Sequence, residues 1–464
     1  MNTQILEAIP HRVSDPSFFN QSVPSVASLT NGGWVVVWQS HDQDGEDTGV
    51  YARVYSADGD AQGEEFQVNA YTDNWQGYPS VAPLDDGSWI VSWHSYGQDG
   101  DNYGVYGKRF LADGSVQDTE FRINTYISEA QKNPSLAPLE DGGWLVTWFS
   151  RQDGSNASVH GQRYSQNGET IGTEFQVNTY TESAQELPKV ASLKDGGWIV
   201  TWVSHLQDGE NGGIFGQRYS ISGDEVGDEF QVNTYTDGWQ QDQAVTALED
   251  GGWIVAWQSE NPNGSGTVLL GQRYAADGKK HSGEFLVDVP LTGYNSAPEI
   301  TSNDDGGWDI VWSFTSADNS TTTIFMQGYS ADGTAQGDPL KISTGSDAEN
   351  STPSVATLED GSWVVAWRGS DGIFSQRVSA DGEIGVVKNN PPTGTVTIVG
   401  TAAEDQTLTI ISNIADEDGI EAVSGGFLNA PLDTRIWTIS GVPIQISDVG
   451  KTFSADQFDG AGFE

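Results

Sequence analysis

Aromatic residues recur in loops that follow one another along the chain at intervals of about 55 residues. The members of this set are Tyr71, Trp75, Tyr78, Tyr126, Tyr180, Tyr235 and Trp239. An aromatic ring stacks well on the apolar face of a sugar, and nearby acidic side chains accept hydrogen bonds from the sugar hydroxyls. We therefore treat these aromatic residues as candidates for ligand binding. The alternative is that they only pack over the edges of the fold.

Acidic residues are concentrated in a second set of loops. They are Asp42, Asp44, Glu46 and Asp47 in one loop, and Asp99 and Asp101 in its counterpart one repeat later. Calcium takes carboxylate and carbonyl oxygens as ligands, so these acids are candidate metal ligands, and calcium is the cofactor they suggest. The loops lack the ordered spacing of an EF-hand, which leaves a solvated hairpin loop as the alternative.

No arrangement of catalytic residues stands out in the sequence. Glycoside hydrolysis usually needs two carboxylates at a set separation, and Asp and Glu together number 66, so spacing cannot single out a pair. His41 and His205 occupy matching positions after a repeated tryptophan, where hydrogen bonding within a loop is the simpler role. We see no Ser/His/Asp order and no phosphate-binding loop. We therefore expect no catalytic residues and no enzymatic activity.

The strands that position these loops are built around one repeated phrase, Trp34-Val-Val-Val-Trp38. It returns at 89–93, 144–148, 198–202, 253–257, 308–312 and 363–367, each time after a glycine-containing turn. Successive side chains of a strand point to opposite faces, so both faces of this strand are apolar. Such a strand has to be covered on both sides, as it is inside a propeller blade. We therefore expect these tryptophans to form the core.

Each repeat predicts one four-stranded sheet. In residues 79–126 the expected strands are Pro79–Leu84, Trp89–Ser95, Val105–Leu111 and Glu120–Asn124. Asp-Gly pairs separate most of these strands and favour hairpin turns, because glycine accepts a positive φ. The phrase occurs seven times, so we predict an all-β, seven-bladed β-propeller over residues 1–388.

The two ends of the repeat region predict a closed ring. Residues near Ile9–Ser14 resemble a fourth strand that has no first three ahead of it. We expect this segment to pair with Ile373–Val378 and to complete the last blade, which removes an exposed sheet edge.

Charged pairs are expected to fix the register of the third and fourth strands. Each pair lies symmetrically about a turn: Arg109 with Glu120, Arg163 with Glu174, Arg218 with Glu229, and Arg273 with Glu284. A hairpin centred on that turn sets the two residues opposite each other. Such a cross-strand pair contributes about 0.2–1 kcal/mol.

The composition changes after residue 388. Residues 389–394, Asn-Asn-Pro-Pro-Thr-Gly, are predicted to be a linker. The expected strands beyond it are Thr395–Gly400, Gln406–Asn413, Arg435–Ile446 and Lys451–Phe458. The third contains Gly441 and Pro443, so two short strands around a turn are the alternative there. We predict a small, truncated immunoglobulin-like β-sandwich over residues 395–464.

The net charge of −46 limits the partners of this chain. It repels phosphate backbones and anionic lipid, so nucleic acid is not an expected partner. No apolar run has the length of a membrane span, and no cysteine is present for a disulfide or a thiolate metal site. The first residues do not resemble a signal peptide, so we expect an export signal outside this chain or a longer parent protein.

The repeated sequence resembles a known class of repeats. Its phrases are Pro-Ser-Val-Ala before the turn, Asp-Gly-Gly-Trp in it, and Gly-Gln-Arg-Tyr and Glu-Phe-Gln-Val-Asn-Thr-Tyr-Thr downstream. They are similar to repeats of very large secreted bacterial proteins of the RTX and adhesin-like type. Residues 393–464 look like the bacterial immunoglobulin-like repeats of the same proteins, on Glu404-Asp-Gln-Thr-Leu408 and Ala415-Asp-Glu-Asp-Gly-Ile420 among others. The glycine-rich nonapeptide that binds calcium in RTX arrays is absent.

The resemblance implies an extracellular or cell-surface location and often a role in adhesion. We therefore predict a non-catalytic binding or spacer module of a multidomain adhesin-like protein, with surface glycans or polysaccharide as candidate partners and calcium as a candidate stabiliser. The alternative is a carbohydrate-active enzyme, a glycosidase or polysaccharide lyase, on a propeller scaffold. Fold class alone cannot separate these functions.

Overall fold

The structure is a computed structural model of the chain. It describes residues 10–18, 20–154, 156–209, 211–261, 266–287, 293–343 and 349–384, with short strands between 395 and 454. Contacts within the chain divide it into two units, Met1–Gly385 and Val386–Glu464. Within the described residues, no helix is long and apolar enough to cross a membrane.

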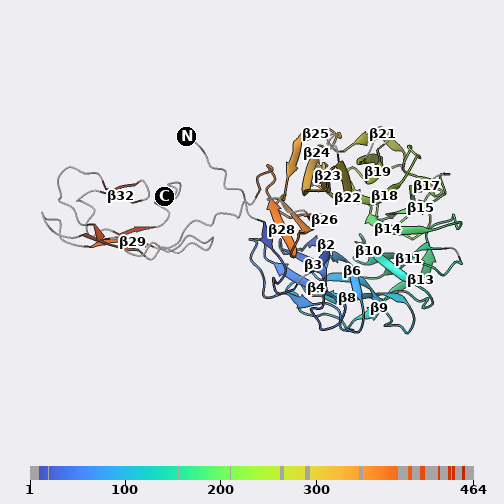
Figure 1. Cartoon of the computed structure of the whole chain (residues 1–464), viewed down its shortest axis with the longest axis horizontal. Coiled ribbons are helices and arrows are strands. Elements are labelled where there is room, and N and C mark those ends of the chain that lie inside the picture. The colour runs from blue at the N-terminus through green and yellow to red at the C-terminus, as the bar shows by residue number, and fades with distance from the viewer. Residues whose placement is uncertain are drawn as a thin grey trace. The chain divides into compact units, whose positions relative to one another are not determined.

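The first unit consists of four-stranded antiparallel sheets that follow one another around a ring, the arrangement of a β-propeller (Figure 1). The innermost strands are β2 (Gln21–Ser28), β6 (Gln76–Pro83), β10 (Gln131–Pro138), β14 (Gln185–Ser192), β18 (Gln240–Ala247), β22 (Gly293–Ser302) and β26 (Ser351–Thr357). The second strands are β3 (Trp34–His41), β7 (Trp89–Tyr96), β11 (Trp144–Ser150), β15 (Trp198–His205), β19 (Trp253–Glu260), β23 (Trp308–Ser316) and β27 (Trp363–Arg368).

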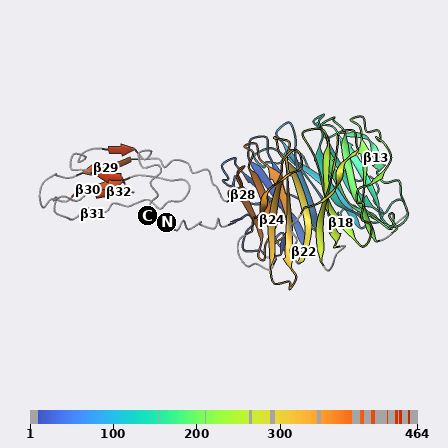
Figure 2. The ribbon, with the colours of Figure 1, turned by 90° about the horizontal axis from the view of Figure 1, so that it is seen from above.

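The outer half of each sheet completes this pattern, and Figure 2 shows the sheets from the side. The third strands are β4 (Thr48–Tyr55), β8 (Tyr103–Phe110), β12 (Ser158–Tyr164), β16 (Gly212–Tyr219), β20 (Thr267–Tyr274), β24 (Thr322–Tyr329) and β28 (Ile373–Val378). The outermost strands are β5 (Phe66–Gln67), β9 (Phe121–Arg122), β13 (Thr170–Gln176), β17 (Phe230–Gln231), β21 (Lys280–Leu286), β25 (Ala335–Lys341) and β1 (His11–Arg12). A single parallel pair, Thr267 with Tyr294, joins two of the sheets into an eight-stranded one.

The turn before each second strand depends on glycine. Gly32 has a φ of 81°, a conformation that L side chains rarely adopt. A Cβ on Gly33 would lie 2.2 Å from the carbonyl oxygen of Tyr55, so a side chain cannot fit there. The pair therefore lets β3 begin directly against β4.

The core lies between the sheets, as the apolar phrase predicts. Trp38, Trp93 and Trp202 are fully buried, and each packs in a cluster with residues of the preceding sheet. The cluster that holds Trp38 also contains Trp34 from β3 and Ile373 from β28, so it joins the first sheet to the last. Burial of a large aromatic side chain stabilises the fold by about 1.5–3 kcal/mol.

The N-terminal strand closes the ring as predicted. His11 and Arg12 of β1 pair with Ser375 and Phe374 of β28. The backbone N–H of Val13 donates to the carbonyl of Ile373 at 2.8 Å. The outermost strand of this sheet therefore comes from the start of the chain.

The predicted Arg–Glu pairs are wrong. In β12 and β13 a bulge follows Gly161 and places Arg163 opposite Ile171 instead of Glu174. Arg163 Nη2 donates to Asp141 at 2.6 Å. Glu174 instead accepts the N–H of Thr125, in the preceding sheet, at 2.6 Å. The acid therefore joins neighbouring sheets.

The other three pairs separate in the same way. Their arginines pair with an aspartate in the turn before the second strand: Arg109 with Asp86, Arg218 with Asp195, and Arg273 with Asp250. Their glutamates, Glu120, Glu229 and Glu284, accept N–H groups of the preceding sheet. Both residue types therefore bind outside the hairpin that was expected to hold them.

The second unit contains two small antiparallel sheets. One has the order β31 (Phe427–Leu428), β30 (Leu408–Ser412), β29 (Thr395–Val399) and β34 (Thr452–Ser454). The other is a hairpin of β32 (Trp437–Ile439) and β33 (Val442–Ile444). The segment that includes Gly441 and Pro443 thus forms two short strands, which was the alternative to one long strand. The predicted linker at 389–394 lies outside the described residues.

Candidate functional site

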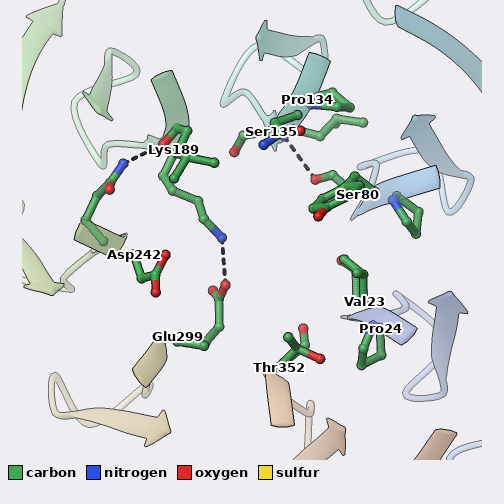
Figure 3. A pocket seen from close by; sticks show the side chains of 18 of the residues that line it. Val23, Pro24, Ser80, Pro134, Ser135, Lys189, Asp242, Glu299 and Thr352 are labelled. Carbon is green, nitrogen blue, oxygen red and sulfur yellow. Dashed lines mark hydrogen bonds and ion pairs between the residues drawn. The ribbon is translucent and has the colours of Figure 1, made fainter. Parts of the chain in front are cut away.

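The innermost strands surround a cavity of about 390 Å³ on the axis of the ring (Figure 3). Its lining comes from all of these strands: 23–26, 78–80, 133–136, 187–190, 242, 243 and 245, 297–299, and 352–355. We call this space the axial cavity. Because every inner strand contributes the same few positions, differences between repeats decide its chemistry.

A bulge in each innermost strand presents side chains to the axial cavity. In β18 the register shifts between Gln241 and Ala244, and Asp242 has a φ of 51°. The residues at the equivalent position have φ values from 47° to 55°: Val23, Tyr78, Asn133, Leu187, Ala297 and Thr352. In every inner strand except β18 the next residue is proline. Proline has no N–H to donate, which suits a place where the ladder is interrupted.

Serine side chains join the inner strands where the repeat is regular. The Ser25 hydroxyl accepts the N–H of Val81 at 3.3 Å, and the Ser80 hydroxyl accepts that of Leu136 at 3.2 Å. The same bond joins Ser135 to Val190 and Ser354 to Val26. The position two residues after each bulge residue is thus a link from one sheet to the next.

Three consecutive sheets depart from this pattern. The serine position is occupied by Lys189 in β14, Ala244 in β18 and Glu299 in β22, and β18 also carries Asp242 at its bulge. Figure 3 shows Lys189, Asp242 and Glu299 pointing into the axial cavity from one side. Lys189 Nζ lies 2.6 Å from Glu299 Oε1. One side of the cavity therefore holds two carboxylates and an ammonium group.

The environment of Asp242 changes its acidity. Burial raises the pKa of its carboxyl group, the ammonium group of Lys189 lowers it, and the carboxylate of Glu299 raises it. The net effect is a raised pKa, which favours a protonated acid able to donate a proton. Glu299 is the partner of a salt bridge. Two carboxyl groups in contrasting environments can act as an acid and as a base or nucleophile.

Two of the sequence-predicted ligand residues lie in one aromatic cluster. The Trp75 ring lies 5.8 Å from that of Tyr78 and 4.7 Å from that of His94. Tyr78 also lines the axial cavity. Trp239 lies two sheets or more away, and its ring packs edge-on against that of His205 with the ring centroids 5.1 Å apart. The structure thus brings Trp75 and Tyr78 together and does not bring Trp239 to them.

The remaining predicted tyrosines occupy equivalent turns on separate sheets. Tyr71, Tyr126, Tyr180 and Tyr235 each offer a backbone carbonyl to a buried asparagine two residues earlier. The amide nitrogen of Asn69 also donates to Gln76 at 3.1 Å, and its oxygen accepts the N–H of Val50 at 2.8 Å. This asparagine therefore fixes the loop between two sheets, which gives the repeated Asn-x-Tyr sequence a structural role.

Several of the predicted metal ligands form hydrogen bonds or ion pairs with other protein groups. Asp44 accepts the side-chain amide of Gln67 at 3.1 Å, and Asp47 lies 3.4 Å from His41. Asp101 accepts the N–H of Glu129 at 3.0 Å, and Asp99 that of Asp101 at 3.4 Å. Across the residues that the structure describes, no group of three or more His, Cys, Asp or Glu side chains could hold a metal ion. Calcium binding at Asp42 and Glu46 or their neighbours stays a prediction.

Sequence reasoning missed Lys189, Asp242 and Glu299. Each is one acid or base among many, and none stands near a recognisable motif. A signal was present all the same: aligned by the repeat, the position reads Ser25, Ser80, Ser135, Lys189, Ala244, Glu299 and Ser354. A break in this regular position would have pointed to Lys189 and Glu299. The bulge position of Asp242 differs from repeat to repeat, so it offers no such signal.

No family model matches this sequence, and no curated protein matches it either. Among solved structures, the chain is similar to an α-L-arabinofuranosidase from Fusarium graminearum, at 12% identity and a TM-score of 0.49, over 70% of this chain and 97% of the other. It is also similar to a polysaccharide lyase, at 10% identity and a TM-score of 0.48, over 77% and 90%. A third is a Hadza microbial sialidase, at 10% identity and a TM-score of 0.44, over 69% and 66%.

These similarities correct one prediction from the sequence. We expected a non-catalytic binding or spacer module and no enzymatic activity, whereas the named structures are carbohydrate-active enzymes. The chain is thus similar in fold to proteins of the kind named in the alternative prediction, carbohydrate-active enzymes on a propeller scaffold.

Proposed function

We propose that the first unit is a seven-bladed β-propeller that hydrolyses glycosidic bonds in the axial cavity. The four-stranded sheets, the core shared by the first and last sheets and the pairing of β1 with β28 support this blade count. The closed ring gives the axial cavity rigid walls. Rigid elements hold catalytic groups more precisely than loops do.

The observation that carries this function is the break in the repeat at Lys189, Asp242 and Glu299. At the position of Lys189 and Glu299, four other sheets hold a serine that links one sheet to the next, and Asp242 lies at the bulge two residues before that position in β18. Charged groups that face a cavity cost desolvation free energy, and a purely structural ring does not need them. Clustered acids with a perturbed pKa in a cavity are typical of catalytic sites.

The two carboxyl groups divide the work of hydrolysis. Asp242, whose pKa burial raises, protonates the oxygen of the leaving sugar. Glu299 activates water or attacks the anomeric carbon, and its negative charge stabilises the oxocarbenium-like transition state. Lys189 holds the Glu299 carboxylate in place through the 2.6 Å ion pair. A positioned acid contributes about 10²–10⁴-fold to the rate.

The charges of the site favour hydrolysis over a lyase reaction. A lyase has to neutralise the carboxylate of a uronate while a base removes the neighbouring proton. Among the described residues that line the axial cavity, Lys189 is the cation, and it is already paired with Glu299. The net charge of −46 also repels an anionic polymer. The proposed substrate is therefore an uncharged glycan.

The experiment is a survey of neutral polysaccharides and aryl glycosides with the purified protein, followed by Asp242→Asn and Glu299→Gln. We expect sugar release by the wild type and a loss of about 10²-fold or more in each variant. Asp58→Asn and Glu64→Gln, exposed acids in the segment between β4 and β5, serve as matched controls and should keep full activity. Unchanged melting temperatures would show that all four variants fold. Full activity in Asp242→Asn would reject the assignment.

Three further properties belong to this proposal. An enzyme that acts on polymeric glycans works where such polymers are found, which supports an extracellular location.

The acidic loops at Asp42–Asp47 and Asp99–Asp101 are offered as calcium sites that stabilise the fold. A melting temperature that rises in millimolar calcium relative to chelator would support them, because a ligand of the native state stabilises it. The strands of the second unit are offered as part of an immunoglobulin-like domain.

A further inference from the structure

A cluster of aromatic rings lies beside the axial cavity, on β6, β7 and β8 and at the residue directly before β6. Its members are Trp75, Tyr78, His94, Tyr96 and Tyr103, and we call it the aromatic platform. Tyr78 stacks on His94 with ring centroids 5.2 Å apart and an interplanar angle of 23°. Tyr103 meets His94 edge-on at 5.2 Å and Tyr96 at 4.9 Å. The rings are thus continuous from the cavity to the rim of the sheet.

In the aromatic platform, a buried ring packs against rings that are open to solvent. His94 is buried, and its Nδ1 accepts the backbone N–H of Asn133 at 3.0 Å, which fixes the ring. Tyr78 and Tyr96 are each 42% exposed. Large aromatic side chains held in one orientation and left open to solvent are ready to stack on a ligand, because little side-chain entropy is lost on binding.

No other sheet repeats this arrangement at the equivalent positions. Tyr78 corresponds to Val23, Asn133, Leu187, Asp242, Ala297 and Thr352. His94 corresponds to Gln39, Phe149, Val203, Gln258, Ser313 and Arg368. A core requirement of the fold would place aromatic residues in every sheet. The platform therefore has a role that the fold itself does not explain.

The platform and the charged residues lie on opposite sides of the axial cavity. Tyr78 and Asp242 occupy the same bulge position in β6 and β18, and both line the cavity. In Figure 3, Ser80, which follows Tyr78 by two residues, lies across the space from Asp242. A chain of sugars that stacks on the platform can thus extend toward the carboxyl groups.

The charges around the platform select the ligand. Burial, together with the ammonium group of Lys132, lowers the pKa of His94 well below its usual value, so this ring is neutral. Lys132 Nζ lies 3.8 Å from the centre of the Tyr103 ring. The surface thus combines apolar ring faces with a few polar groups that can reach sugar hydroxyls, and the strongly negative chain repels acidic sugars.

We propose that the aromatic platform binds a neutral polysaccharide by stacking, and that the bound chain leads into the axial cavity. The second part of this statement rests on the proposed hydrolase function, while stacking itself does not. The substrate is accordingly a polymer, and the platform acts on affinity for it and leaves the chemical step alone.

The test uses Asp242→Asn protein, which should leave polymers intact, and measures binding of arabinan, galactan, mannan and polygalacturonate by calorimetry. We expect a neutral polymer to bind and the added pair Tyr78→Ala and Tyr96→Ala to weaken it about tenfold or more. Tyr294→Ala, an exposed tyrosine of another sheet, is the matched control and should not change affinity. With Asp242 restored, the same pair should raise KM for the polymer more than KM for a short glycoside.

The outcomes separate the two proposals. Unchanged affinity in the tyrosine pair, equal loss in Tyr294→Ala, preference for polygalacturonate, or no binding of any polymer would each overturn the platform. Weakened binding in the pair, combined with full activity of Asp242→Asn, would keep the platform and reject the hydrolase. An unchanged melting temperature of the tyrosine pair excludes misfolding as the cause.

Discussion

The inner strands of the first three sheets and those of the next three share one backbone and differ in chemistry. In β2, β6 and β10 the position after the bulge is Ser25, Ser80 or Ser135, and each hydroxyl links its sheet to the next. In β14 and β22 the same position holds Lys189 and Glu299, which bond to each other across β18. A repeat can thus supply links between sheets in one half and charged side chains that face the cavity in the other, while both halves keep the same bulged main chain.

Restoring the regular pattern should produce the largest effect. The triple variant Lys189→Ser, Ala244→Ser and Glu299→Ser recreates the serine links in β14, β18 and β22. We expect it to fold with an unchanged melting temperature or a higher one, and to lose about 10²–10⁴-fold of its activity on glycans. Ser80→Ala, on the regular half, should retain activity. An active triple variant would show that the contrast between the two halves has no functional meaning.

A second departure from the repeat concerns Asp309 of β23, which replaces an apolar residue such as Ile90 or Ile254. It is 3% exposed and accepts a hydrogen bond from Asn303 at 2.6 Å. Burial raises the pKa of Asp309 from its ordinary range to about 6. The folded state thus favours the protonated acid. Its contribution to the free energy of unfolding is therefore present at low pH and is lost as pH rises through about 6.

The loss amounts to about 3 kcal/mol for a shift of about two pKa units. We therefore expect Asp309→Asn to raise the free energy of unfolding at pH 8 by up to that amount and to change it little at pH 4. Chemical denaturation at both values measures the difference. Asp304→Asn, an acid of the neighbouring exposed turn, is the control. An equal gain at both pH values would contradict the explanation.

The links at the outer strands should give a smaller effect. Arg163 bonds to Asp141 at 2.6 Å and donates to the carbonyl of Ile221 in the next sheet at 2.8 Å. Its guanidinium group lies 5.2 Å from the Trp198 ring. We expect Arg163→Met to lower the free energy of unfolding by about 1–3 kcal/mol in denaturant titrations.

Glu174 offers a direct comparison with that arginine. The register predicted from the sequence pairs Arg163 with Glu174. A double-mutant cycle of Arg163→Met and Glu174→Gln tests whether the two side chains interact. Because they bond to different sheets, we expect their effects to add within about 0.5 kcal/mol. A larger coupling energy would show that Arg163 and Glu174 interact directly, as the predicted register requires.

The smallest expected effect is a shift of the pH profile. The ammonium group of Lys189 lowers the pKa of Asp242, so Lys189→Met should raise it. Activity that needs protonated Asp242 would then persist to higher pH, and the alkaline limb of kcat/KM should move upward. Lys194→Met, which removes an exposed cation paired with Glu249, should leave the limb in place. A downward shift would contradict the assignment of Asp242 as the acid.

Sequence patterns predicted much of the frame. The spacing and two-sided apolar character of Trp34–Trp38 predicted buried second strands, and the segment near Ile9–Ser14 predicted the closure that β1 makes. These inferences succeeded because strand periodicity and burial are local properties. The Arg163–Glu174 pair failed because a bulge next to Arg163 shifts the register, and a symmetrical hairpin pattern carries no signal for a bulge.

The candidate site was harder to predict for a different reason. Lys189, Asp242 and Glu299 lie far apart in the sequence, and only the ring brings them to one cavity. Trp75 and Tyr78 belong to the predicted set of candidate ligand residues, whereas His94 and Tyr103 contact Trp75 through the fold of their strands and were not in that set. Pairing across a sheet can be inferred once the repeat is aligned, whereas side-chain direction at a bulge cannot.

The contribution of β1 to the last sheet has a consequence for self-association. If the short strand His11–Arg12 detaches, β28 is left with an unsatisfied edge of backbone N–H and C=O groups. The same strand from a second molecule fits that edge as well as the molecule's own does. Concentrated protein should thus form domain-swapped oligomers more readily when the connection between β1 and β2 is shortened, and dilution should return it to closed monomers.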